Sequence, residues 1–207
     1  MMNPKVSVIV PIYNAEKFID KTLDSLVNQT LNDIEIICIN DGSTDKTLSI
    51  LEDYKNKYMD KIIVYSKPNG GIAETRNYGL SKVTSEYFGF VDSDDTVELD
   101  MFEKMYKKAL ETNSDIVFSD FYWSYPHKET IVKDGPYSSK KLILTSMFAT
   151  LWNKLYKTSF IREIEINFPN GYRYEDASFL YKLAPYIRVW SYIETPFVHY
   201  RQTTGSI

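Results

Sequence analysis

The sequence has little of several features that would place it in a special class. Its 207 residues include one cysteine, Cys38, which excludes an internal disulfide and lies in an apolar run typical of a buried thiol in a reducing compartment. No apolar run approaches the roughly 20 residues that a membrane-spanning helix needs. The N-terminal stretch "MMNPKVSVIVPIYN" lacks the apolar length and the cleavage site of a signal peptide. These absences predict a cytoplasmic protein, with peripheral membrane contact left open.

An excess of basic charge is also missing. The formal net charge is −4 at pH 7, which argues against a basic surface that grips nucleic acid. Repeats and low-complexity segments are not found. The chain does contain 43% hydrophobic residues and 17 tyrosines, enough for one globular domain with a full core and a small appendage. Nothing in it indicates an oligomeric state.

Strand patterns alternate with helix patterns along the first 123 residues. Apolar, β-branched runs predict strands, and apolar positions three or four residues apart predict helices. The predicted strands are 5–13, 34–40, 61–66, 86–91 and 115–123. The predicted helices follow the N-cap candidate Asn14, follow the turn "DGSTD" (41–45), and occupy 72–82 and 98–113. This alternation predicts an α/β fold with a mostly parallel sheet and helices on both faces.

The pattern becomes less regular from about residue 124. Residues 139–158 and 175–184 are predicted to be helical, and residues 189–201 to be extended. We assign residues 1–122 to a nucleotide-binding half. Residues 123–207 form a smaller half that completes the site on the acceptor side.

Three of the predicted strands end in unusual polar groups. The first ends in "YN" (13–14), the second in "NDGSTD" (40–45) and the fourth in "DSDD" (92–95). Ligands of parallel α/β sheets bind beyond the carboxyl ends of the strands, so these groups are expected at one edge. A turn with a helix cap would explain "NDGSTD" alone. A cap needs one acceptor, however, and "DSDD" offers three carboxylates.

The three acids favour a divalent cation. Asp92, Asp94 and Asp95 repel one another, and a cation that also carries substrate phosphates would offset that repulsion. Mg²⁺ and Mn²⁺ accept carboxylate oxygens in this manner. Two mechanisms use such a strand end. In one, "FVDSDDT" (90–96) resembles the motif of haloacid-dehalogenase-type phosphatases, with Asp92 as nucleophile and Asp94 as acid/base. In the other, the acids hold a metal on the diphosphate of a sugar nucleotide.

The ordered set of motifs is more specific than any one of them. The segments "VSVIVPIYNAEKFIDKTLDSLVNQT", "NDGSTDKT", "NGGIAETRNYGL", "FVDSDD", "WNKLYK", "YEDASF" and "HYR" together resemble glycosyltransferase family 2. Members of that family are inverting enzymes with the Rossmann-like GT-A fold. The resemblance implies transfer of a hexose or N-acetylhexosamine from a UDP-sugar to a hydroxyl of a glycan, lipid-linked or protein acceptor. The phosphatase and a non-catalytic module that binds a nucleotide sugar remain as alternatives.

The resemblance also implies roles for individual residues. Nucleotide contacts are implied for Pro11, Tyr13, Asn14, Asp41, Arg76, Asp92 and Ser93. The ligands implied for Mn²⁺ or Mg²⁺ are Asp94 and His199. The implied general base is Asp176, with Glu175 as second choice. The residues implied at the diphosphate or acceptor side are Trp152, Lys154, Arg201 and Ser206.

Structural roles would explain several of these residues equally well. Arg76 could be an exposed helix residue, and His199 a structural residue of a strand. Glu175 and Asp176 could complement a helix dipole in its first turn. Trp152 could belong to the core.

Family members often build bacterial surface polysaccharides on lipid carriers at the inner face of the membrane, or glycosylate surface proteins. The resemblance implies the same kind of location and partners here. Similar enzymes often continue beyond the "HYR" segment with residues that contact the acceptor or the membrane. The resemblance implies that such a segment belongs to the full activity.

Overall fold

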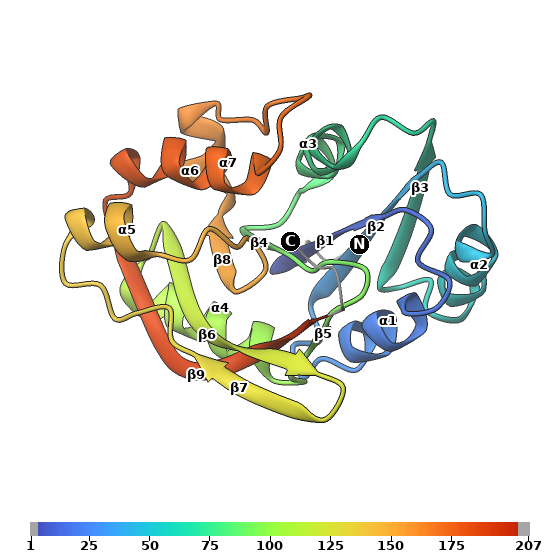
Figure 1. The fold of residues 1–207 in the computed structure, drawn as a ribbon, viewed down its shortest axis with the longest axis horizontal. Coiled ribbons are helices and arrows are strands. Elements are labelled where there is room, and N and C mark those ends of the chain that lie inside the picture. Colours follow the sequence, from blue (N-terminus) through green and yellow to red (C-terminus); the bar gives the residue numbers. More distant parts are fainter. Residues whose placement is uncertain (1–3, 203–207) are drawn as a thin grey trace.

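The computed structural model describes residues 4–202 and contains one mixed sheet with helices on both sides (Figure 1). The strands are β1 (Val6–Ile12), β2 (Ile34–Asp41), β3 (Ile62–Lys67), β4 (Tyr87–Phe90), β5 (Thr96–Val97), β6 (Ile116–Tyr125), β7 (Lys128–Val132), β8 (Lys154–Lys157) and β9 (Trp190–Arg201). The helices are α1 (Ile19–Val27), α2 (Thr47–Lys57), α3 (Ile72–Lys82), α4 (Met101–Thr112), α5 (Lys140–Ser146), α6 (Thr158–Ile164), α7 (Glu175–Leu183) and the short 3₁₀ helix η1 (Ala184–Tyr186).

The strand order is β3-β2-β1-β4-β8-β6-β9-β5, with β7 attached to β6. The part from β3 to β4 is parallel, as the alternating pattern predicted. The rest is mixed, because β8 runs antiparallel to both of its neighbours, β4 and β6. Beyond β6, strand β9 is parallel to β6 and antiparallel to β5. The prediction of an α/β fold with a largely parallel sheet is confirmed, with a mixed C-terminal part.

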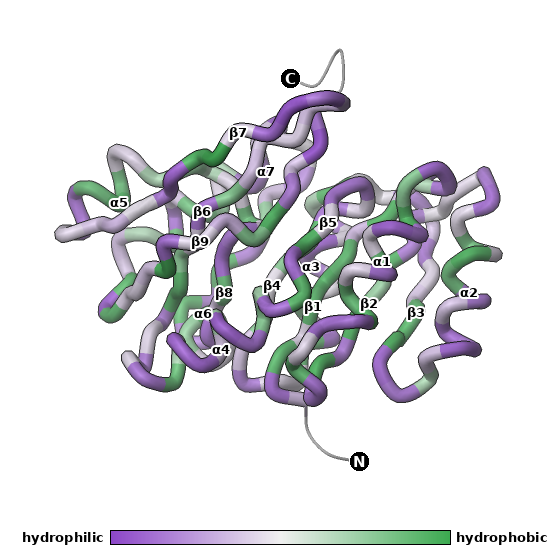
Figure 2. The backbone as a smooth tube through the Cα atoms, turned by 90° about the horizontal axis from the view of Figure 1, so that it is seen from below, coloured by the Kyte–Doolittle hydropathy of each residue, from purple (hydrophilic) through white to green (hydrophobic). Residues whose placement is uncertain are grey.

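Helices cover both faces of the sheet because alternate strand residues point to opposite sides. In β1, Val6, Val8 and Val10 pack with residues of α1, α2 and α4. Between them, Ile9 packs with residues of α3, α6 and α7 on the other face. Figure 2 shows hydrophobic stretches in the central strands β1 and β2, with hydrophilic segments in loops and on outer helices. The hydrophobic cores on the two faces of the sheet hold the parallel strands in place, with their carboxyl ends at one edge.

Most predicted elements of the first 123 residues are confirmed to within a few residues, and α3 has the predicted bounds. The N-cap role of Asn14 is wrong, because α1 begins only at Ile19. Asn14 instead adopts a left-handed conformation, with φ of 49°. Its N–H donates to Ser43 Oγ (3.0 Å), and its Oδ1 accepts from the Thr44 N–H (2.8 Å). Asn14 therefore holds the loop after β2 against the end of β1.

The predicted helix over residues 139–158 is wrong in its second half. Between residues 139 and 157 only α5 (Lys140–Ser146) is helical, residues 154–157 form strand β8, and α6 begins at Thr158. The apolar spacing in this segment suits a helix, but pairing with β4 and β6 on both sides decides the outcome. Tertiary context has overridden the local pattern.

Two further points concern the chain as a whole. Strand β6 passes through the position between residues 122 and 123, so the proposed halves share one continuous sheet, and their division remains a prediction about roles. Within residues 4–202, each helix is too short or too polar to cross a bilayer.

Candidate active site

A cleft of about 590 Å³ opens beyond the carboxyl ends of β1, β2 and β4. Six of the seven residues assigned to the nucleotide line it, namely Pro11, Tyr13, Asp41, Arg76, Asp92 and Ser93. Asp94 and Arg201 line the same cleft, whereas Asn14 does not. Ser206 lies outside the described residues. The three polar strand ends thus meet at one edge, as the parallel topology predicted.

Asp41 anchors one wall of the cleft. Its carboxylate accepts from Lys67 Nζ (2.5 Å) and from the N–H groups of Gly70 and Gly71 (2.9 Å each). Burial works to raise the pKa of Asp41, but these bonds outweigh it and lower the pKa. Gly71 has φ of 85°, a conformation that favours glycine. Because a carboxylate has about four acceptor positions, Asp41 retains capacity for a ligand N–H.

The "DSDD" loop also lines the cleft, and nearby cations offset the negative charges of its acids only in part. Burial and the neighbouring charge of Asp92 raise the pKa of Asp94, whose nearest cation is the Arg201 guanidinium at 4.0 Å. Burial, with the charges of Asp92 and Asp94, raises the pKa of Asp95 well above its ordinary value. Asp95 Oδ1 accepts from the Arg201 N–H (2.8 Å), and its buried Oδ2 has no partner in the described part of the chain. A positive charge bound at this loop would therefore be stabilised by its carboxylates.

Arg76 is not an exposed helix residue, since it is only 6% exposed. Its Nη2 donates to Asp92 Oδ1 (3.2 Å), and its Nη1 donates to Glu175 Oε1. The guanidinium therefore joins the acid loop after β4 to the first turn of α7. This places Glu175 as the partner of Arg76 and sets the position of its neighbour, Asp176.

Asp176 lies in the first turn of α7, half-buried, and its Oδ1 accepts from the Ala177 N–H (2.7 Å). Burial raises the pKa of Asp176, against the lowering effects of the Ala177 N–H and Arg76. The preceding residue, Tyr174, has φ of 59°, an unfavourable conformation for a side chain of its size. Such strain is often found where a functional group must be aimed.

His199 lies in β9 beside the cleft. Its ring stacks on Tyr122, with centroids 4.6 Å apart. Its Nε2 contacts Glu98 (2.9 Å) and its Nδ1 contacts Glu129 (2.8 Å), so both ring nitrogens have carboxylate partners. A smaller cavity of about 370 Å³ is lined by both His199 and Asp94. Within residues 4–202, no three His, Cys, Asp or Glu side chains are placed so that they could hold a metal ion together.

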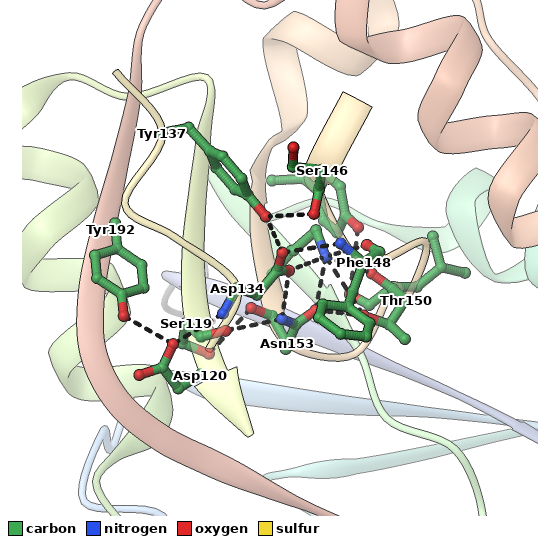
Figure 3. Close-up of polar contacts among 12 residues, drawn as sticks. Ser119, Asp120, Asp134, Tyr137, Ser146, Phe148, Thr150, Asn153 and Tyr192 are labelled. Carbon is green, nitrogen blue, oxygen red and sulfur yellow. Dashed lines mark hydrogen bonds and ion pairs between the residues drawn. The ribbon is translucent and has the colours of Figure 1, made fainter. Parts of the chain in front are cut away.

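Lys154 is fully buried and offers no exposed atom to a diphosphate or an acceptor. Its ammonium pairs with Asp134 (2.8 Å) and donates to Asn153 Oδ1 (2.8 Å). It also donates to the carbonyl oxygens of Phe148 (3.0 Å) and Thr150 (2.8 Å). Figure 3 shows Asp134 at the centre of this network. The predicted placement of Lys154 at the substrate is thus replaced by a buried structural role.

Trp152 is also buried, only 3% exposed, and it contacts a residue of the cleft wall without lining the cleft itself. Its ring stacks on Tyr200, with centroids 4.9 Å apart and an interplanar angle of 26°. Tyr200 lines the cleft and was missed from the sequence, although it lies between the two residues chosen in "HYR". Neighbouring residues of a strand point to opposite faces, so the assignment of His199 did not indicate that Tyr200 lies in the wall of the cleft.

Comparison with known proteins decides the family. The model of "Glycosyl transferase family 2" matches residues 7–178. The chain belongs to glycosyl transferase family 2. It is 36% identical over 191 residues to the uncharacterized glycosyltransferase EpsJ of Bacillus subtilis, a match that covers 86% of this chain and 55% of EpsJ. It is 34% identical to the cholesterol galactosyltransferase of Borreliella burgdorferi, covering 98% of this chain and 62% of that one.

A solved glycosyltransferase-type structure has the same fold. S. aureus TarS 1-349, in complex with UDP-GlcNAc, matches with a TM-score of 0.81 and 29% identity, over 98% of this chain and 60% of TarS 1-349. The fold is therefore GT-A, as expected from the motifs. This chain spans between half and two thirds of the length of these relatives. Family membership also decides against the phosphatase interpretation of "FVDSDDT".

Proposed function

We propose that this family 2 chain transfers a hexose or N-acetylhexosamine from a UDP-sugar to a hydroxyl of a glycan, lipid-linked or protein acceptor, with inversion. The observation that carries the proposal is the cleft itself. Its walls carry the exposed ring of Tyr13, the hydrogen-bonded carboxylate of Asp41 and the acids of the "DSDD" loop. A nucleotide, a diphosphate and a sugar would fit along that sequence of groups.

The relatives support the donor class without fixing the sugar. TarS is solved with UDP-GlcNAc, and the B. burgdorferi relative is named as a galactosyltransferase. The proposal therefore keeps both hexoses and N-acetylhexosamines. Peripheral contact with the inner face of the membrane, where lipid-linked acceptors are found, belongs to the same proposal.

The acid loop suits a divalent cation. Asp94 is the most accessible of the three acids, and burial together with the neighbouring carboxylates raises the pKa values of Asp94 and Asp95. Mn²⁺ and Mg²⁺ are commonly held by one or two carboxylates together with substrate phosphates, so a protein cluster of three ligands is not needed. Asp94 would hold the ion, and His199 would join by giving up one of its two carboxylate partners. When bound, the ion supplies electrostatic stabilisation of the charge on the departing diphosphate.

The residues around the cleft account for the remaining steps. Asp176 takes the proton of the acceptor hydroxyl, and the hydroxyl oxygen attacks the anomeric carbon from the face opposite the diphosphate. The bond from the anomeric carbon to the diphosphate oxygen breaks, and UDP leaves with the bonding electrons. Arg76 fixes the position of Asp176 relative to the acid loop, because it bonds to both Glu175 and Asp92. One displacement inverts the configuration, and no covalent enzyme intermediate forms.

Calorimetric titration with UDP tests the proposal. We expect UDP to bind in the presence of Mn²⁺ and to bind at least about 10-fold more weakly in EDTA, since one charge-assisted contact contributes roughly 1.5–3 kcal/mol. Asp94→Asn should abolish the difference between the two conditions. The carboxylate is lost while the shape of the side chain is kept.

Asp53→Asn is the matched control, because Asp53 is an exposed carboxylate on α2, away from the cleft. It should bind UDP as the wild type does. Absence of UDP binding by the wild type, with and without Mn²⁺, would overturn the proposed function.

The pH dependence of turnover tests the role of Asp176. A general base must be ionised, so kcat/KM should rise with pH through the pKa of the free enzyme. Because burial raises the pKa of Asp176, the midpoint of this acid limb should lie above the usual aspartate value of about 3.9. UDP release from the donor is followed at saturating Mn²⁺, with circular dichroism at each pH to confirm folding. A midpoint at or below the usual value would argue against Asp176 as the base.

A further inference from the structure

A single side chain joins α3 to the segment that leads into α7. That segment, residues 165–174, connects α6 to α7 without a regular helix or strand. Asn77 of α3 bonds twice to the backbone of Phe168: its Nδ2 donates to the carbonyl oxygen (2.8 Å), and its Oδ1 accepts from the N–H (2.8 Å). In the part of the chain that the structure describes, no other hydrogen bond links residues 166–173 to a helix or strand. Asn77 therefore fixes the segment at Phe168.

An asparagine suits this contact because its amide carries both a donor and an acceptor, which match the C=O and N–H of one residue. Phe168 is only 2% exposed, and a backbone group that is buried without a partner is costly. The two bonds thus satisfy backbone groups for which no other partner lies within reach.

The ring of Phe168 carries this constraint to α7. It stacks on Phe179, with ring centroids 4.2 Å apart and an interplanar angle of 10°. Phe179 is fully buried in α7, three residues after Asp176 and so about one helical turn further along. The same ring packs edge-on against Phe90, with centroids 5.6 Å apart, and Phe90 is the last residue of β4. Phe168 therefore packs against both the helix of the proposed base and the strand that leads to the acid loop.

Arg76, the neighbour of Asn77 in α3, reaches the same region by a second route. Its guanidinium carbon lies 5.7 Å from the centroid of the Phe168 ring, and its Nη1 bonds to Glu175, the first residue of α7. Helix α7 is thus held to α3 at its first residue by Arg76, and about one turn later through Phe168 and Phe179. Two separated contacts fix the direction of a helix as well as the position of its end.

A base acts only when its carboxylate is aimed at the acceptor hydroxyl, and a misplacement of about 1 Å can cost about 100-fold in rate. We propose that Asn77 is a positioning residue for Asp176 and acts through Phe168 and Phe179. Neither Asn77 nor Phe168 lines the donor cleft, so this role is separate from binding of the nucleotide. The inference rests on the proposed function, which makes Asp176 the base.

The first test separates turnover from binding. Asn77→Ala removes both bonds to Phe168, and we expect kcat for UDP release, measured with the panel of acceptors, to fall about 10- to 100-fold. The Kd for UDP with Mn²⁺ should stay within about 2-fold. Asn56→Ala, at an exposed asparagine of α2, is the matched control and should change neither value.

A double variant tests whether the effect passes through Asp176. When Asp176→Asn has already removed the base, Asn77→Ala should lower the residual turnover by less than about 2-fold. An equal fall in both backgrounds would overturn the inference, because a general structural defect acts whether or not the base is present.

Hydrogen exchange followed by mass spectrometry tests the link to α7 without any turnover. In Asn77→Ala, the amides of residues 175–183 should exchange about 5-fold faster or more, while those of β1 and β2 keep the wild-type rate. Phe168→Leu keeps the bonds to Asn77 but removes the stacked ring, and it should have the same effect on α7. This variant also serves where Asn77→Ala fails to fold.

The outcomes separate this inference from the proposed function. Unchanged exchange across α7 in both variants would overturn the inference, and so would faster exchange with wild-type turnover. Failure of the wild type to bind UDP, or to release it from any donor, would instead overturn the proposed function, and the role of Asp176 as the base with it. Exchange across α7 would then decide by itself whether Asn77 holds that helix.

Discussion

Replacing Asp176 with Asn is expected to lower turnover of the donor by about 10²- to 10⁴-fold, the usual contribution of a general base. The amide keeps the shape of the side chain and its place in the first turn of α7, but it cannot take a proton. UDP release from the bound UDP-sugar, with and without a panel of acceptors, measures the effect. The Kd for UDP should stay within about 2-fold, because Asp176 lies outside the residues that line the nucleotide end of the cleft.

Asp53→Asn again serves as the carboxylate-to-amide control and should turn over donor at the wild-type rate. Turnover retained in Asp176→Asn to within about 10-fold would remove this residue from the role of base. A wild type that binds UDP but releases none from any donor or acceptor would indicate a non-catalytic binding module.

The second large effect is on stability. Lys154→Met is expected to lower the free energy of unfolding by about 3–5 kcal/mol, because it leaves the carboxylate of Asp134 buried without its cation. This is a large fraction of the roughly 5–15 kcal/mol that keeps a domain folded. Urea unfolding followed by circular dichroism measures the loss. Lys157→Met, at a partly exposed lysine of the same strand, should cost less than about 1 kcal/mol.

The double variant Lys154→Met with Asp134→Asn distinguishes an unpaired charge from simple loss of packing. Removing the second charge should recover stability, with a coupling between the two sites of roughly 0.5–3 kcal/mol. It also keeps the test usable where the single variant fails to fold. Additive losses in the double variant would show that the two charges do not act as a pair.

The parallel half of the fold was predictable because each of its elements carries its own local signal. Helix α3 begins after the two glycines of "KPNGG" and keeps its predicted bounds, and β2 is rich in isoleucine. Elements that depend on partners were not predictable in this way. Strand β8 has four residues, "KLYK", whose spacing fits a helix equally well, and only its insertion between β4 and β6 makes it a strand.

The same division applies to the site. Polar groups at strand ends could be predicted to meet, because topology alone brings them together. The buried state of Arg76 and Lys154 could not, since their partners Glu175 and Asp134 are distant in sequence. Tyr200 was missed for a related reason. Its place in the wall of the cleft follows from the stack with Trp152 and from the course of β9, and neither can be predicted from the residues around it.

The late arrival of β9 bears on how the protein is made. The Arg201 N–H reaches Asp95 across 106 positions of sequence, so the acid loop is synthesised long before the strand that closes over it. On the ribosome, β1 to β4 can pair as they emerge, since domains form largely in the order of translation. The wall that carries Tyr200 and Arg201 is added only when the last described strand is released. A nascent chain would thus pair the strands that carry Tyr13, Asp41 and Asp92 before the wall from β9 is added to the cleft.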